Sequence, residues 1–215
     1  MGKIKDKIIY ENPIFVLILG LCSSLAITTK FENAYIMGIC VLLVLLFSST
    51  IVSLTRKIIP DNVKIPVYII IVATFVTSIE IVLIKYVKDM YDILGVYLPL
   101  IVVNCIVLGR CLTVASKEKV LTSIKDALGI GIGYTIALMI IASIREILGS
   151  NTITLMDSIS SLTGYKAIYT ILPNSKIFPI PFFNSPAGAF ITIGLLMALF
   201  NYLKEKREAK KDESN

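Results

Sequence analysis

Two cysteines stand at matching places in two apolar stretches of the chain. Cys22 lies within "LILGLCSSLAIT", and Cys105 lies within "LPLIVVNCIVLGR". Cysteine thiolates are soft ligands that bind iron–sulfur clusters, zinc or Cu(I), and a 2Fe–2S cluster usually has four of them. These two cysteines would supply half of that set. The other half would come from Cys40 and Cys111, or from a similar pair on a partner subunit.

The alternative to ligation is packing, because free cysteine is among the most buried residue types and packs as a small hydrophobe. Cys40 and Cys111 suit this role. Cys111 follows Cys105 by six positions, which on a helix turns it roughly 120° away from Cys105. These two cysteines therefore do not share a helix face.

The segments that carry the cysteines belong to a chain that is too apolar for a soluble domain of its length. Of its 215 residues 56% are hydrophobic, and the mean hydropathy is +0.83. Apolar stretches of roughly 18 to 20 residues cross a bilayer as helices, which satisfy every backbone polar group internally. We predict one all-α integral membrane domain over residues 1–215, with six transmembrane helices at about 13–29, 34–55, 65–86, 93–114, 127–148 and 186–203.

The basic residues predict how this domain is oriented. Fifteen of the 21 Lys and Arg residues fall in the two tails and in the second and fourth connections, and six fall on the other side. Basic residues are enriched in cytoplasmic connections. We therefore expect a multi-pass protein of the bacterial cytoplasmic (inner) membrane with both termini in the cytoplasm. The net charge of +6 then mainly reflects topology, and no nucleic-acid partner is predicted.

The six segments divide into two groups of three, which predicts two inverted three-helix repeats. The overlap of "LGLCSSL" with "VVNCIVL", 83 positions apart, is the clearest similarity between the halves. In this arrangement Cys22 and Cys105 would lie near the bilayer midplane, one in each repeat. Pro13, Gly95 and Pro99 are candidates for breaks where those two helices begin.

Some kinds of site are excluded by residue type. The chain has no histidine, which removes bis-His haem, His-zinc sites and a His proton relay. It also has no C-x-x-C pair, so thioredoxin-like and zinc-ribbon chemistry are absent. "GIGIG", within a predicted membrane helix, suits a small-xxx-small packing face through Gly129 and Gly133 better than a dinucleotide loop.

A few polar residues stand near the cysteines or inside predicted helices. Asn104 precedes Cys105 and could tune a metal site or cap the backbone at a helix break. Arg110 could offset the charge of an all-thiolate cluster or mark the cytoplasmic edge. Glu80, Arg145 and Glu146 lie near the outer interface. They could form an ion path, or Glu80 and Arg145 could form a structural salt bridge.

Four motifs resemble one known family. The motifs "NPIFVLILGLCSSLAIT", "LPLIVVNCIVLGR", "SIREILG" and "SPAGAFITIGLL" resemble the E subunit of the Rnf complex, an ion-translocating ferredoxin:NAD oxidoreductase. The resemblance runs from about residue 10 to residue 205. The D subunit of the sodium-translocating NADH:quinone reductase is a close relative with nearly the same motifs, and it stays an alternative.

The resemblance implies a chain that acts as one subunit of a redox enzyme, without a complete active site of its own. It implies pairing with an A-type sister subunit of opposite orientation, each giving two cysteines to one intramembrane 2Fe–2S cluster. Here those would be Cys22 and Cys105. Electrons would pass from ferredoxin through this cluster to flavin-bearing subunits and on to NAD, coupled to sodium or proton export.

Two further expectations concern the rest of the chain. The segment 149–185, rich in Ser, Thr, Pro and Asn, would be a lid or a contact for flavin-bearing subunits, or an ordinary interfacial loop. Two other functions stay open from the residues alone. One is a stand-alone secondary transporter that uses Glu80, and the other is a scaffold whose cysteines only pack.

Overall fold

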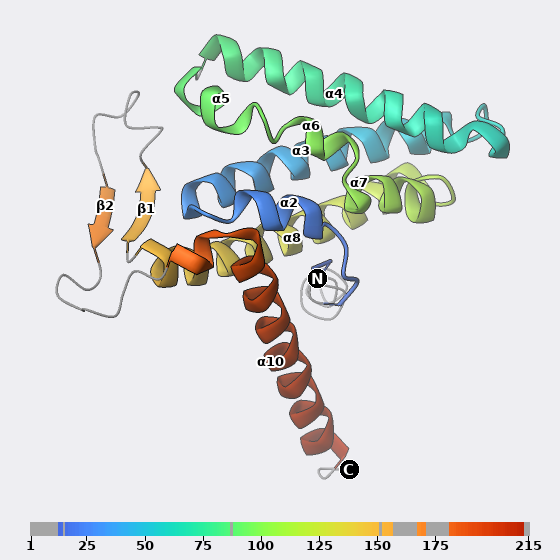
Figure 1. The fold of residues 1–215 in the computed structure, drawn as a ribbon. Helices are drawn as coiled ribbons and strands as arrows, with labels where there is room; N and C mark the ends of the chain where they lie inside the picture. Colours follow the sequence, from blue (N-terminus) through green and yellow to red (C-terminus); the bar gives the residue numbers. More distant parts are fainter. Residues whose placement is uncertain are drawn as a thin grey trace.

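The computed structural model of this chain describes residues 13–14, 16–86, 88–150, 152–156, 167–170 and 181–212. Its elements follow in chain order (Figure 1): α2 (Leu21–Ile27), α3 (Phe31–Thr55), η1 (Asp61–Val63), α4 (Lys64–Tyr86), α5 (Lys88–Leu94), α6 (Pro99–Val102), α7 (Cys105–Arg110), the π-helical turn η2 (Cys111–Ala115), α8 (Val120–Ser150), β1 (Thr152–Met156), β2 (Ala167–Thr170), η3 (Pro181–Asn184) and α10 (Pro186–Asp212). Among the described residues the regular elements are helical except for β1 and β2. These strands form an antiparallel hairpin with Thr152 opposite Thr170, within the segment that was predicted to be a loop.

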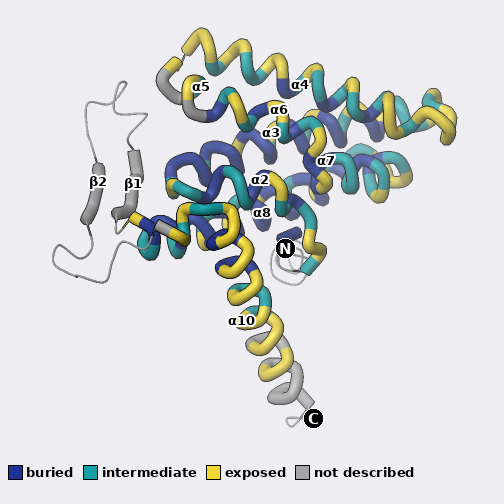
Figure 2. Tube along the Cα trace, viewed as in Figure 1, coloured by how far each residue is buried: buried dark blue, intermediate teal, exposed yellow. Residues whose placement is uncertain are grey.

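An antiparallel pair of long helices, α3 and α8, forms the centre of the molecule. At one end the backbone N–H of Phe31, the first residue of α3, donates to Glu146 near the end of α8. At the other end Ser53, near the end of α3, donates to the carbonyl of Glu118 just before α8. Both helices are largely buried (Figure 2). They form the scaffold on which the shorter helices lie.

Small residues let α3 and α8 approach closely. A Cβ atom on Gly131 would lie 3.0 Å from the Leu42 side chain, and a Cβ on Gly38 would lie 2.6 Å from Thr135. Close approach through small residues is typical of helix contacts in membranes. Gly131 of the "GIGIG" stretch thus makes the close contact with α3, whereas the packing face was predicted through Gly129 and Gly133. These two glycines are buried in α8, and their close packing against another helix stays a prediction.

Three helices are long and apolar enough to cross a membrane, and they match predicted segments two, three and five. They span Phe31–Thr55, Asp61–Tyr86 and Val120–Ser150. Two shorter apolar helical stretches, Pro99–Ala115 and Pro186–Tyr202, correspond to predicted segments four and six. The prediction of an apolar helical membrane protein is therefore confirmed.

The first predicted helix, 13–29, is wrong for most of its length. Only Leu21–Ile27 is α-helical, and the described residues before it are irregular. Ile18 and Gly20 have left-handed backbone conformations, with φ of 55° and 79°. Right-handed helix cannot pass through such residues, so the helix begins only after Gly20.

The fourth predicted helix, 93–114, is broken as well. Pro99 begins α6, which lasts only to Val102, and Asn104 is extended with φ −65° and ψ 120°. The chain then re-enters helix at Cys105 and widens into the π-helical turn η2. The breaks expected near Gly95 and Pro99 do occur, but the decisive one comes immediately before Cys105.

The remaining helices flank this centre. Helix α4 lies beside α3, where Phe47 and Phe75 stack with centroids 5.7 Å apart. Helix α10 projects away from the bundle, and most of its described side chains are exposed (Figures 1 and 2).

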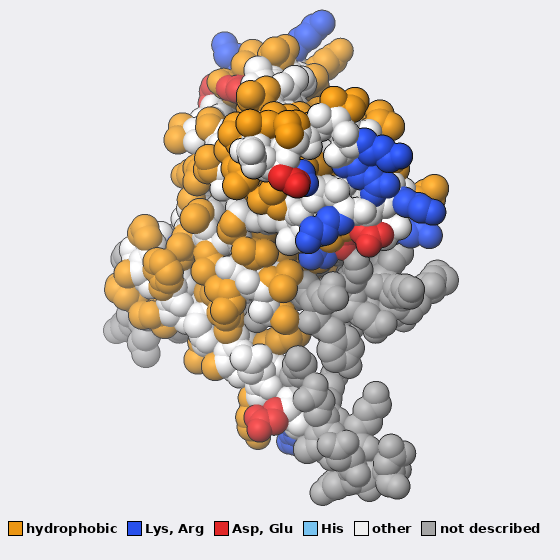
Figure 3. All heavy atoms as spheres, turned by 90° about the vertical axis from the view of Figure 1, so that its right-hand side faces the viewer, with side chains coloured by type: hydrophobic (Ala, Val, Ile, Leu, Met, Phe, Trp, Pro, Cys, Tyr) orange, Lys and Arg blue, Asp and Glu red, His pale blue; other side chains and the backbone are white. Residues whose placement is uncertain are grey.

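Basic side chains gather at the end of the bundle where α3 ends and α8 begins (Figure 3). Arg56 donates there to the carbonyls of Lys117 and Glu118. The second and fourth predicted connections therefore lie together at one end, as the charge pattern requires. The N-terminal tail with Lys3, Lys5 and Lys7 lies outside the described residues.

Candidate metal centre

Cys22 and Cys105 are brought to one place by a contact between their segments. The backbone N–H of Gly20, two residues before Cys22, donates to the sulfur of Cys105 at 2.8 Å. Both cysteines are exposed, whereas Cys40 and Cys111 are buried. The two matched cysteines thus form an open pair at the surface, and the other two pack inside the helical core.

Each cysteine of this pair stands at the beginning of a short helix. Cys22 is the second residue of α2 and Cys105 is the first residue of α7. Backbone N–H groups at a helix start have no partner within the helix and carry partial positive charge. Cysteine binds metals through its thiolate, so each of these side chains is a possible ligand.

Asn104 forms the N-cap of α7 and also joins the two cysteine segments. Its side-chain oxygen accepts from the backbone N–H of Ile106 at 3.1 Å, which is the usual N-cap bond. Its side-chain nitrogen donates to the Ser23 hydroxyl at 3.2 Å. The capping interpretation of Asn104 is confirmed, and the same side chain links the neighbour of Cys105 to the neighbour of Cys22.

Ser23 lies at the centre of a buried polar group. Its Oγ donates to the carbonyl of Gly20 at 3.1 Å and lies 2.5 Å from the hydroxyl of Tyr134 on α8. Ser23, Asn104 and Tyr134 are all buried. The exposed cysteines are therefore backed by an internal hydrogen-bonded layer.

Arg110 pairs with Asp126 of α8. Two hydrogen bonds, 2.9 and 2.6 Å long, join the guanidinium to the two carboxylate oxygens. The side chains are 15% and 2% exposed. A two-point Arg–carboxylate contact has a defined geometry, so it fixes the end of α7 against α8.

Arg145 is wholly buried and bonds to oxygen atoms from two parts of the chain. One nitrogen donates to the Leu25 carbonyl at 3.3 Å and to the Thr28 hydroxyl at 2.6 Å, both at the end of α2. The others donate to the carbonyls of residues 183–185, just before α10. Arg145 thus ties the first cysteine helix to the start of α10.

The predicted salt bridge between Glu80 and Arg145 does not form between these described residues. Glu80 accepts a hydrogen bond from the Tyr91 hydroxyl at 3.0 Å instead. That bond to the carboxylate raises the pKa of Tyr91. The Glu146 carboxylate accepts a hydrogen bond from the backbone N–H of Phe31 at 2.6 Å, at the first residue of α3. The three polar residues assigned to the outer level thus have separate structural partners.

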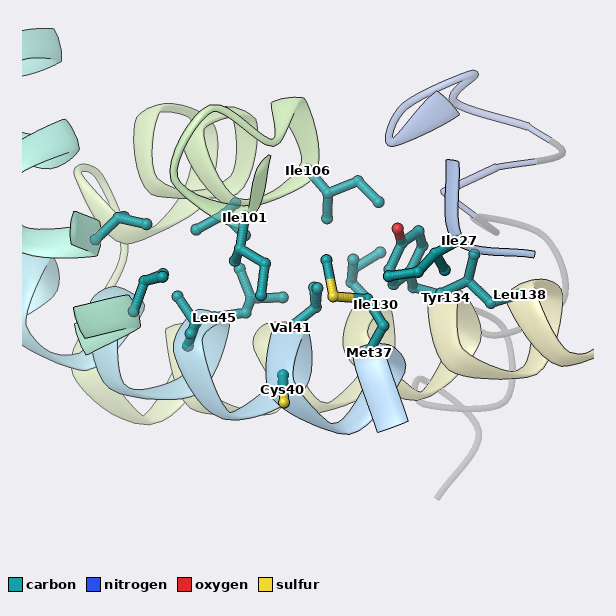
Figure 4. Close-up of a cluster of buried hydrophobic side chains, with 14 of the residues drawn as sticks. Ile27, Met37, Cys40, Val41, Leu45, Ile101, Ile106, Ile130, Tyr134 and Leu138 are labelled. Atoms are coloured by element: carbon teal, nitrogen blue, oxygen red, sulfur yellow. The ribbon is translucent and has the colours of Figure 1, made fainter. Parts of the chain in front are cut away.

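The other two cysteines, Cys40 and Cys111, are buried. Cys40 is part of the hydrophobic cluster and points away from its other labelled members (Figure 4). Cys111 is completely buried, and its sulfur lies 3.8 Å from the Ser48 hydroxyl. Their different burial from Cys22 and Cys105 agrees with the predicted difference between the two pairs.

Sequence reasoning missed Gly20, Asp126 and Tyr134. The signals were weak: a glycine two positions before Cys22, an acid in the first turns of a membrane helix, and a tyrosine directly after "GIGIG". An acidic residue within an apolar helix is the one signal that points to a partner such as Arg110.

The two exposed cysteines are too few to hold a metal cluster by themselves. Among the described residues no group of three or more His, Cys, Asp or Glu side chains is placed to hold a metal ion. Two exposed thiols at helix starts, with a sulfur already accepting a backbone hydrogen bond, fit two of the four ligands of a 2Fe–2S cluster.

Comparison with known proteins agrees with the predicted resemblance. The family described as "Rnf-Nqr subunit, membrane protein" matches residues 1–197. The E subunit of the Na(+)-translocating ferredoxin:NAD(+) oxidoreductase complex of Acetobacterium woodii is 42% identical over 96% of this chain and 98% of its own length. The E subunit of the ion-translocating oxidoreductase complex of Methanosarcina acetivorans is 43% identical over 93% of this chain and 89% of its own length.

A third relative extends the comparison to a different ion. The E subunit of the proton-translocating ferredoxin:NAD(+) oxidoreductase complex of Clostridium ljungdahlii is 41% identical over 97% of this chain and 93% of its own length. With a family match over most of its residues and relatives at this identity over nearly its whole length, the chain belongs to the Rnf-Nqr family of membrane-protein subunits.

Proposed function

We propose that this chain is the E subunit of an ion-translocating ferredoxin:NAD oxidoreductase complex in the bacterial cytoplasmic membrane. In this proposal Cys22 and Cys105 supply half the ligands of an intramembrane 2Fe–2S cluster. The observation that carries the cluster is the hydrogen bond from the Gly20 N–H to the Cys105 sulfur, since it joins the two distant segments that hold the exposed cysteines. The relatives named as E subunits support the assignment to the complex.

The second pair of cysteine ligands would come from an A-type sister subunit. A 2Fe–2S cluster needs four thiolates in total, and this chain's other two cysteines are buried inside its own core. The exposure of Cys22 and Cys105 leaves room for such a partner. When bound, the cluster supplies one-electron transfer. The residues of this chain hold two sulfurs and direct a backbone N–H at one of them.

The order of elements also supports two inverted repeats. In each half a short helix with a cysteine at its start, α2 or α7, precedes a long helix, α3 or α8. The two long helices are antiparallel, as repeats of opposite direction require. The third members would be α4 and α10. The gathering of basic residues where α3 ends and α8 begins supports placing that end, and both termini, in the cytoplasm.

The assignment as an E subunit does not depend on which ion the complex transports. A sodium-named relative and a proton-named relative are almost equally similar to the chain. The transporter alternative rested on Glu80, whose described partner is the Tyr91 hydroxyl. We also propose the partners of this chain. They are the A-type sister subunit, the flavin-bearing subunits, ferredoxin and NAD.

The test is to purify the complex with the neighbouring membrane subunits and record EPR spectra. Cys22→Ser and Cys105→Ser should each abolish a 2Fe–2S signal and ferredoxin-dependent NAD reduction. Cys40→Ser and Cys111→Ser are the matched controls and should keep the signal. If the signal survives both substitutions of the exposed pair, those cysteines are not ligands and the cluster assignment is wrong.

A further inference from the structure

Tyr134 is a buried residue whose hydroxyl points at the cysteine segments. It belongs to α8, is 0% exposed, and its Oη lies 2.5 Å from Ser23 Oγ. Its ring also lies beside Gly20, since a Cβ there would be 3.0 Å from Tyr134 Cε2. Tyr134 thus contacts the first cysteine segment through its ring and its hydroxyl (Figure 4 shows the residue in the core).

Counting donors fixes the direction of these hydrogen bonds. The Ser23 hydroxyl has one proton and two lone pairs. The proton goes to the Gly20 carbonyl, which can only accept. Asn104 donates its side-chain N–H to Ser23 Oγ. The Tyr134 hydroxyl must therefore donate to the remaining lone pair, and all three positions on Ser23 are filled.

This arrangement leads from Tyr134 to the sulfur of Cys105. Tyr134 donates to Ser23, Ser23 donates to the carbonyl of Gly20, and the N–H of Gly20 donates to Cys105 Sγ at 2.8 Å. Gly20 is held on its N–H by Cys105 and on its carbonyl by Ser23 Oγ and by the backbone N–H of Ser24 at 3.2 Å. Glycine has few steric constraints of its own, so these bonds fix the orientation of Gly20 in its left-handed conformation.

We infer that Tyr134 is a positioning residue that, through Ser23, holds the Gly20 N–H on the Cys105 sulfur and so sets the reduction potential of the cluster. The inference rests on the proposed 2Fe–2S function. A hydrogen bond to a ligating sulfur stabilises the more negatively charged, reduced state and raises the potential. Loss of the Tyr134 hydroxyl loosens Gly20 and weakens this bond. The potential should then become more negative while both cysteine ligands stay in place.

The experiment is an EPR-monitored redox titration of the purified complex, with iron content measured on the same samples. Tyr134→Phe removes the hydroxyl and keeps the ring, and Ser23→Ala removes the link to Gly20. Tyr68→Phe is the matched control, because Tyr68 is a buried tyrosine of α4 whose hydroxyl has no hydrogen-bond partner among the described residues. Ser23→Thr keeps a hydroxyl at position 23 and tests for rescue.

In Tyr134→Phe and Ser23→Ala we expect the iron content to be unchanged. The ratio of reduced to oxidised cluster at a fixed potential should fall by up to about tenfold. For a one-electron couple tenfold corresponds to about 59 mV. Tyr68→Phe should titrate like the parent, and Ser23→Thr should titrate closer to the parent than Ser23→Ala.

If Tyr134→Phe and Ser23→Ala both show the same reduction potential as the parent complex, the inference is overturned. The cluster itself would still be established by its EPR signal. If the Tyr134→Phe complex does not assemble, the comparison of Ser23→Ala with Ser23→Thr decides, since equal titrations of the two would also overturn it. Failure of the proposed function looks different: the parent complex would then have no 2Fe–2S signal that depends on Cys22 and Cys105.

Discussion

At Cys22 and at Cys105 the cysteine side chain is exposed, while the side chain of an adjacent residue is buried. Cys22 is exposed while Ser23 is buried, and Cys105 is exposed while Asn104 is buried. The division of the four cysteines into two pairs could be predicted from sequence, because Cys22 and Cys105 occupy matching places in two segments, and their exposure agrees with it. Their metal chemistry stays a prediction. The internal layer could not be predicted, since Ser23, Asn104 and Tyr134 meet only after three segments pack together.

Gly20→Ala should destabilise the protein by roughly 1–3 kcal/mol. The new methyl group would lie 2.5 Å from Ile106 Cδ1, at a residue with φ +79°. The measurement is the apparent melting temperature in detergent, with iron content of the complex as a second readout. Gly194→Ala on α10 is the control, because a Cβ there meets nothing within 4 Å. Equal melting temperatures for the two variants would contradict this account of Gly20.

Separating Arg110 from Asp126 should cost about 3–5 kcal/mol, since it leaves one charge buried without its counter-ion. We expect Arg110→Met and Asp126→Leu each to lower the melting temperature. The double variant should be less affected than the two single changes added together, because the unpaired charge is gone. Strict additivity in this double-mutant cycle would show that the pair, bonded at 2.6 and 2.9 Å, is not energetically coupled.

At the scale of elements, hydropathy predicted where the chain crosses the membrane but not where its helices are interrupted. Segments 34–55, 65–86 and 127–148 correspond to long helices because their apolar runs continue without a break. Segments 13–29 and 93–114 have the same apolar character, yet their helices begin at Leu21 and restart at Cys105. The left-handed Gly20 and the extended Asn104 are stabilised by tertiary hydrogen bonds, which hydropathy does not contain.

Arg145→Met should loosen the end of α2 and lower stability by about 3 kcal/mol or more, because several buried oxygen atoms lose their donor. Arg145→Lys should be intermediate, since an ammonium group lacks the planar set of donors that reaches both α2 and residues 183–185. Hydrogen exchange of amides 21–31 is the measurement. Arg56→Met is the control, because Arg56 also donates to two carbonyls but at an exposed site. If both variants exchange alike, Arg145 does not hold α2.

At the scale of the whole molecule, the four cysteines should differ in their reaction with N-ethylmaleimide. In the separate chain Cys22 and Cys105 should be modified rapidly, and Cys40 and Cys111 slowly, in line with their exposure. In the assembled complex all four should be protected, since a sister subunit and the cluster would cover the exposed pair. Rapid labelling of Cys22 or Cys105 in a complex that retains its iron would contradict the shared site.

The contacts that hold the first cysteine helix have a consequence for synthesis. Ser23 is bonded to a residue 111 positions later and Thr28 to one 117 positions later, while the partner of Gly20 comes 85 positions later. A ribosome makes the N-terminal part first. Cys22 therefore emerges long before any group that fixes its helix, and it waits for α7 and then α8 to be inserted. The segment around Cys22 therefore reaches its final structure late in synthesis, and under the proposed function iron would be inserted only after that.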